Sequence, residues 1–74
     1  MKGTVTVTDV KLEKGEPKSF KLNGKRVEVN IVILLVPGRL WFAIVLNGVT
    51  YDLKQEAEGT WTLTEEGPLS RRRE

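Results

Sequence analysis

The chain has 74 residues, enough for one small domain, and it contains neither cysteine nor histidine. Disulfides, thiolate nucleophiles, zinc–thiolate sites and imidazole bases are therefore excluded, and much of enzyme chemistry is excluded with them. The formal net charge of +2 arises from 12 Lys and Arg against 10 Asp and Glu, and the excess lies in the three arginines at 71–73. No apolar signal-peptide core precedes the first strand pattern, so we expect no targeting signal and leave the localisation open.

The first predicted strand covers residues 3–14 and changes phase along its length. Val5 and Val7 share one parity of the alternation, whereas Val10 and Leu12 share the other. Such a change within one strand is what a β-bulge near Thr8-Asp9 would produce. Bulges bend strands, and small barrels need bends to close. A loop is expected at residues 14–17.

Three turn signals define the middle of the chain. Asn23-Gly24 favours a type I′ hairpin between strands 18–22 and 25–36, and Asn47-Gly48 favours another after strand 40–46. Pro37-Gly38 lies between the two most apolar strands and is also typical of a turn. The two Asn-Gly turns predict these cross-strand pairs: Phe20 with Val27, Leu46 with Val49, Ile44 with Tyr51, and Phe42 with Leu53. A last strand is expected at residues 60–65.

The hairpin at residues 31–46 is apolar on both faces. If Val36 and Arg39 flank its turn, one face points inward and contains Val29, Ile31, Ile33, Leu35, Leu40, Phe42, Ile44 and Leu46. The opposite face then points outward and contains Val32, Leu34, Val36, Trp41, Ala43 and Val45. A small antiparallel sheet normally keeps one face polar. We therefore expect the outward face either to bind a partner or to be covered by the first or last strand of the same chain.

A membrane-spanning helix is not expected here. The apolar runs at 31–36 and 40–46 are separated by Pro-Gly-Arg, and a span needs about 20 apolar residues. The fold class we predict is all-β: a small closed or partly open antiparallel β-barrel of about six strands. It would occupy residues 1–66, with 67–74 as a C-terminal tail. A two-sheet, immunoglobulin-like sandwich is the alternative.

The charged residues do not indicate catalysis. The carboxylates of Asp52, Glu56, Glu58 and Glu65-Glu66 are expected on strand ends, turns and outward positions, where they would be solvated. We predict no catalytic residue, no cofactor and no metal site. Three adjacent arginines at 71–73 are too few and too clustered for phosphate-led binding, so nucleic acid is not the expected partner.

The local signals agree with one another throughout residues 3–66. Two Asn-Gly turns, Thr, Lys and Glu on outward positions, and a bulge where closure needs one all favour the same fold. In this the chain resembles de novo designed small β-barrels, or designed β-sandwiches. The resemblance implies a structural scaffold without enzymatic activity. The apolar hairpin adds the expectation of an interaction module that binds itself, as a homo-oligomer, or another protein; a small OB- or SH3-like module binding nucleic acid or peptide is the alternative.

Overall fold

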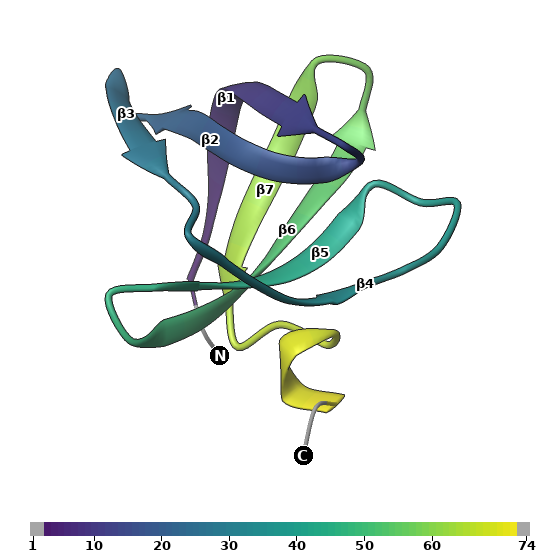
Figure 1. Ribbon diagram of the computed structural model, residues 1–74. Helices are drawn as coiled ribbons and strands as arrows, with labels where there is room; N and C mark the ends of the chain where they lie inside the picture. Colours follow the sequence, from purple (N-terminus) through teal and green to yellow (C-terminus); the bar gives the residue numbers. More distant parts are fainter. Residues whose placement is uncertain (1–2, 73–74) are drawn as a thin grey trace.

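The structure is a computed structural model that describes residues 3–72 (Figure 1). These residues form one antiparallel sheet and a short 3-10 turn. The strands are β1 (Thr4–Glu13), β2 (Glu16–Leu22), β3 (Lys25–Glu28), β4 (Ile31–Leu35), β5 (Trp41–Leu46), β6 (Val49–Ala57) and β7 (Thr60–Glu65), and the 3-10 turn is η1 (Ser70–Arg72). The prediction of an all-β, antiparallel fold is therefore confirmed.

The seven strands follow the order β3-β2-β1-β7-β6-β5-β4 in a single continuous sheet, which curls into a half-barrel (Figure 1). There are seven strands rather than about six because the predicted strand 25–36 is two strands. Val29 donates its N–H to Lys18 O (2.9 Å) as the last contact with β2, and after Asn30 the chain pairs with β5 instead. The two halves of this stretch consequently form the opposite edges of the sheet.

The predicted bulge in β1 is confirmed. The register with β2 shifts between Thr8 and Lys11, and Asp9 adopts a positive φ of 53°. β1 pairs with β7 from Thr4 to Val7 and with β2 from Thr8 onward, on both sides of the shift. The bulge thus bends β1 so that it belongs to both arms of the half-barrel.

Both Asn-Gly hairpins also have the predicted register. Phe20 pairs with Val27 across Asn23-Gly24, and all three pairs predicted across Asn47-Gly48 are present. Each turn has positive φ at both central residues, as a type I′ turn requires. The predicted loop at 14–17 is tighter than expected, because Lys14-Gly15 makes the turn and Pro17 already lies in β2.

The predicted register of the Pro37-Gly38 hairpin is wrong. The Val36 N–H donates to Trp41 O (3.2 Å), so four residues rather than two lie between the last paired residues, Val36 and Trp41. A register shift between β4 and β5 lies between Val32 and Leu34, where Ile33 forms a bulge in β4. Because side chains alternate along a strand, this bulge reverses the faces of Ile31 and Val32 relative to the prediction.

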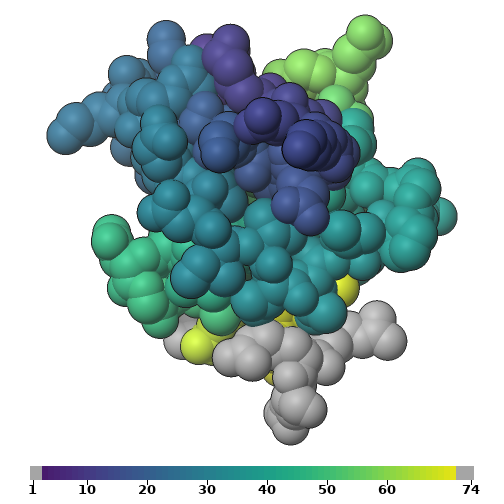
Figure 2. Space-filling model, viewed as in Figure 1, coloured from purple at the N-terminus to yellow at the C-terminus, as the bar shows by residue number. Residues whose placement is uncertain are grey.

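The core lies on the concave side of the sheet. Its largest fully buried side chains are Phe20, Phe42, Ile44, Leu53 and Val7. Trp61 stacks on Phe42 with ring centroids 6.4 Å apart, and Val32 packs against this cluster. Figure 2 shows the molecule from the same side as Figure 1 in space-filling form. The teal residues of β4 and of the loop that follows it lie at the surface in this view. Within residues 3–72, no helix has the length and apolar character needed to cross a membrane.

Candidate functional site

Most of the predicted outward residues share the convex face of the sheet. Leu34 pairs with Ala43, and Ala43 pairs with Asp52 on β6, so their side chains lie on one face together with Trp41 and Val45. Val32 is the exception, because it pairs with Ile44 and packs on the core. Val36 lies just beyond β4 and is half-buried.

Asp52 is the centre of a polar cluster on this convex face. Only 3% of the residue is exposed, so the prediction that its carboxylate is solvated is wrong. Its Oδ2 accepts the Trp41 indole N–H and the Leu69 N–H, both at 2.8 Å, and its Oδ1 accepts the Ser70 N–H at 2.7 Å. The carboxylate thereby ties the segment at residues 67–71 to β5 and β6.

This C-terminal segment covers part of the predicted interface. Ala43 is fully buried, and Trp41 is half-buried with Lys54 Nζ 4.9 Å from the centre of its ring. Neither the first nor the last strand makes this cover; residues 67–71 do, with Leu69 buried. The sequence offered one signal for it, the leucine between Pro68 and the charged end of the chain. Ala43 is thus not accessible to a partner.

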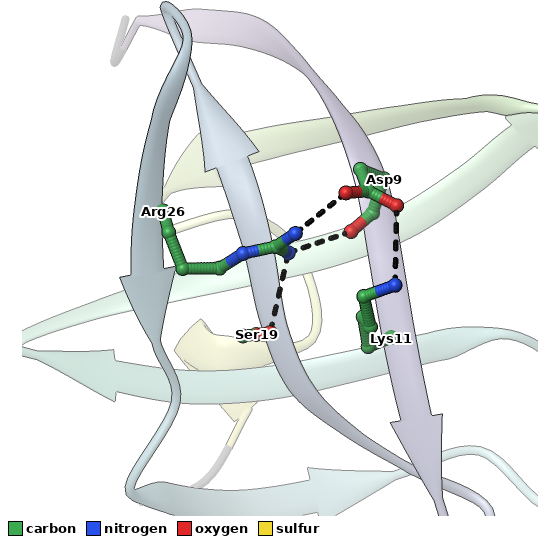
Figure 3. Close-up of polar contacts among 4 residues, drawn as sticks. All are labelled: Asp9, Lys11, Ser19 and Arg26. Carbon is green, nitrogen blue, oxygen red and sulfur yellow. Dashed lines mark hydrogen bonds and ion pairs between the residues drawn. The ribbon is translucent and has the colours of Figure 1, made fainter.

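A second polar cluster joins β1 to β3 across β2 (Figure 3). Arg26 donates from Nη2 to Asp9 Oδ2 (2.5 Å) and from Nη1 to the Asp9 carbonyl (3.1 Å) and to Ser19 Oγ (3.3 Å). Lys11 Nζ lies 3.7 Å from the other carboxylate oxygen of Asp9. The hydrogen bond from Arg26 is the main reason that the pKa of Asp9 lies below its usual 3.8, and the charge of Lys11 lowers it further.

The contacts of this second cluster connect neighbouring strands and have a structural role. A carboxylate with a lowered pKa is a weak base, and an arginine stays protonated, so neither activates the Ser19 hydroxyl. The contacts instead hold the bulge at Asp9 against β3. Among the residues that the structure describes, no group of three or more acidic side chains is placed to hold a metal ion.

The most accessible apolar surface lies along β4 and the loop that follows it. Ile31 is 50% exposed and Leu35 is 46% exposed, and Leu40 is exposed as well. The prediction placed all three inward. In residues 3–72, β4 pairs only with β5, and an open groove between residues 13–18 and residues 29–32 lies beside the start of its other edge, at Ile31 and Val32. Backbone groups on that edge are therefore accessible to another strand.

Two other open edges of the same sheet, those of β3 and of the start of β2, are protected. Three of the four residues of β3 are charged, in the sequence KRVE. The part of β2 that extends beyond β3 contains Pro17, which has no N–H, between Glu16 and Lys18. By contrast, β4 reads IVILL, with neither charge nor proline. Charged residues and proline are the usual means of preventing edge-to-edge association, so of the two terminal strands of the described sheet β4 is the one without them.

Comparison of the chain with protein-family models, with curated proteins and with solved structures found no match.

Proposed function

We propose that the protein is a non-catalytic interaction module that binds an extended protein segment along the outer edge of β4. In this proposal the chain is a partly open β-barrel, and its opening is the groove between β2 and β4. The observation that carries the proposal is the contrast between the edges: charge or proline protects β3 and the start of β2, whereas β4 is apolar and accessible. The interaction surface consists of Ile31, Leu35, Leu40 and the half-buried Leu34 and Val36, and it replaces the wider face expected from the sequence.

Strand addition is the binding mode that this edge favours. An added strand forms main-chain hydrogen bonds with the edge, and its side chains cover those that flank it. Ile31 faces the convex side and Leu35 the concave side, since they pair with Val45 and Phe42 respectively. An added strand would therefore bury apolar surface on both sides of the sheet, which is the main source of binding free energy. Apolar side chains along the edge favour a protein segment over nucleic acid, which needs cationic contacts.

We also propose that the chain is a designed scaffold. Supporting this, two hairpin turns have Asn-Gly at their left-handed positions, Asn23-Gly24 and Asn47-Gly48, and an ion pair between Asp9 and Arg26 holds the β1 bulge. Idealised scaffolds of this kind are typically very stable. Reversible thermal unfolding with Tm above about 90 °C would support this assignment, and Tm in the range of about 45–65 °C would contradict it.

A synthetic peptide tests the binding mode. The probe contains residues 30–36, NIVILLV, extended at both ends by lysines for solubility, and binding is followed by NMR chemical shifts of the labelled protein. We expect saturable shifts concentrated in the amides of β4, and weaker binding of a peptide with proline in place of Ile33. Absence of binding, or shifts spread over β3 and β7, would overturn the proposed function.

A further inference from the structure

We propose that the segment bound at β4 is β4 of a second copy, and that the two strands pair antiparallel about a two-fold axis. This inference rests on the proposed function and names its partner. The geometry follows from symmetry, because a two-fold axis perpendicular to the sheet, passing between the two edges, places the same strand antiparallel to itself on both sides of the interface. The sheet would then continue from one copy into the other.

The composition of β4 fits this partner. Residues 29–38 carry no charge, so a two-fold axis at β4 brings no like charges together. The strand that pairs with an apolar, β-branched edge should itself be apolar and β-branched, and β4 is such a segment of this chain. Ile31 and Leu35, on opposite faces near the edge, would both be covered by the neighbouring copy.

The charges that flank β4 favour the antiparallel orientation. Glu28 precedes the strand and Arg39 follows it, and both are exposed. Antiparallel pairing brings Glu28 of one copy toward Arg39 of the other at each end of the interface. Parallel pairing would instead bring like charges together at both ends.

The backbone at Leu35 supplies the hydrogen-bonding groups. The Val36 N–H donates to Trp41 O on β5. Since successive residues of a strand direct their backbone groups to opposite sides, the N–H and C=O of Leu35 point away from β5 and toward the open edge. They are therefore placed to pair with the second copy.

The first test is native mass by sedimentation or light scattering across a hundredfold concentration range. We expect the mass to rise from 8.4 kDa toward twice that value as concentration increases. Leu35→Lys should raise the dimer Kd at least about tenfold, because pairing would bury an uncompensated charge. Leu12→Lys is the matched control, since Leu12 on β1 is 44% exposed against 46% for Leu35, and it should leave the Kd unchanged. Ile31→Lys is a second edge variant, used if Leu35→Lys loses its native circular dichroism.

A charge exchange tests the orientation. Glu28→Arg should weaken the dimer, and the double variant Glu28→Arg with Arg39→Glu should restore it. A chain that is monomeric at every concentration, or a double variant that is no tighter than Glu28→Arg, would overturn the two-fold antiparallel pairing. If the chain stays monomeric while the NIVILLV peptide binds at β4, the proposed function stands and only the identity of the partner is wrong; if neither associates, both fail.

Discussion

Trp41 and Leu69 donate hydrogen bonds to the same carboxylate oxygen, Oδ2 of Asp52, at equal distances of 2.8 Å. One donor is the indole of β5 and the other is the backbone of the C-terminal segment. Together with the Ser70 N–H on Oδ1, they satisfy a carboxylate that is almost fully removed from water. The Asp52 carboxylate therefore joins the C-terminal segment to both β5 and β6.

Replacing Asp52 with alanine should lower the free energy of unfolding by about 2–4 kcal/mol, because two buried backbone donors and the half-buried Trp41 indole lose their acceptor. Chemical denaturation monitored by tryptophan fluorescence measures the loss. Glu58→Ala is the control, because Glu58 is exposed in the turn after β6, and we expect it to change stability by less than about 0.5 kcal/mol. Equal stability of the two variants would show that the Asp52 cluster does not hold the segment.

Trp41→Phe removes one donor and keeps most of the aromatic surface. We expect a loss of about 1 kcal/mol, the usual net value of a hydrogen bond. The effects of Trp41→Phe and Asp52→Ala should not be additive, because both remove the same contact. A double-mutant cycle measures the coupling, and strict additivity would contradict the shared hydrogen bond.

Gly67→Ala should destabilise the C-terminal segment. A Cβ at Gly67 would lie 2.7 Å from Asp52 Cγ, closer than carbon atoms approach, so the segment or the carboxylate must move. Overpacking of this kind costs about 1–3 kcal/mol. Gly3→Ala is the matched control, since a Cβ at that position meets no atom within 4 Å. The same denaturation experiment compares them, and indistinguishable variants would mean that the approach at Gly67 is easily relieved.

The ion pair between Asp9 and Arg26 predicts how the stability of the fold depends on pH. Its pKa in the folded state lies below 3.8, mainly through the hydrogen bond from Arg26. The stabilisation is therefore fully present above the unfolded-state pKa and is lost as pH falls through the lower folded-state value. Carboxyl carbon NMR should show Asp9 titrating below 3.8, and Arg26→Gln should move its pKa upward. An unchanged pKa in that variant would exclude Arg26 as the cause.

The sequence correctly predicted the two Asn-Gly hairpins and the β1 bulge, because each of them depends on residues that are close together in the chain. The two Asn-Gly turns need positive φ at both central residues, so they fixed their registers and with them most of the concave core. The phase change between Val7 and Val10 likewise located the β1 bulge. The Pro37-Gly38 loop was mispredicted because Pro-Gly suits loops of more than one length, and Arg39 and Leu40 continue the pattern of a strand.

Other features depend on contacts distant in sequence and left no local signal. The bulge at Ile33 lies in an unbroken apolar run, where no alternation marks a change of phase. The break at Asn30 occurs because one extended stretch has to leave β2 and join β5. The donors of Asp52 lie 11, 17 and 18 residues away, so nothing near Asp52 distinguishes it from a solvated carboxylate. The unprotected edge of β4 became apparent only with the strand order.

Amide hydrogen exchange at Leu35, measured against protein concentration, reports directly whether the open edge of β4 pairs with a second copy. We expect the Leu35 amide to exchange rapidly in dilute solution, because it points away from β5, and to become protected as concentration rises. The Val36 amide, which donates to Trp41 O, should be protected throughout and serves as the internal reference. A Leu35 amide that exchanges at the same rate at every concentration would contradict association through the edge of β4.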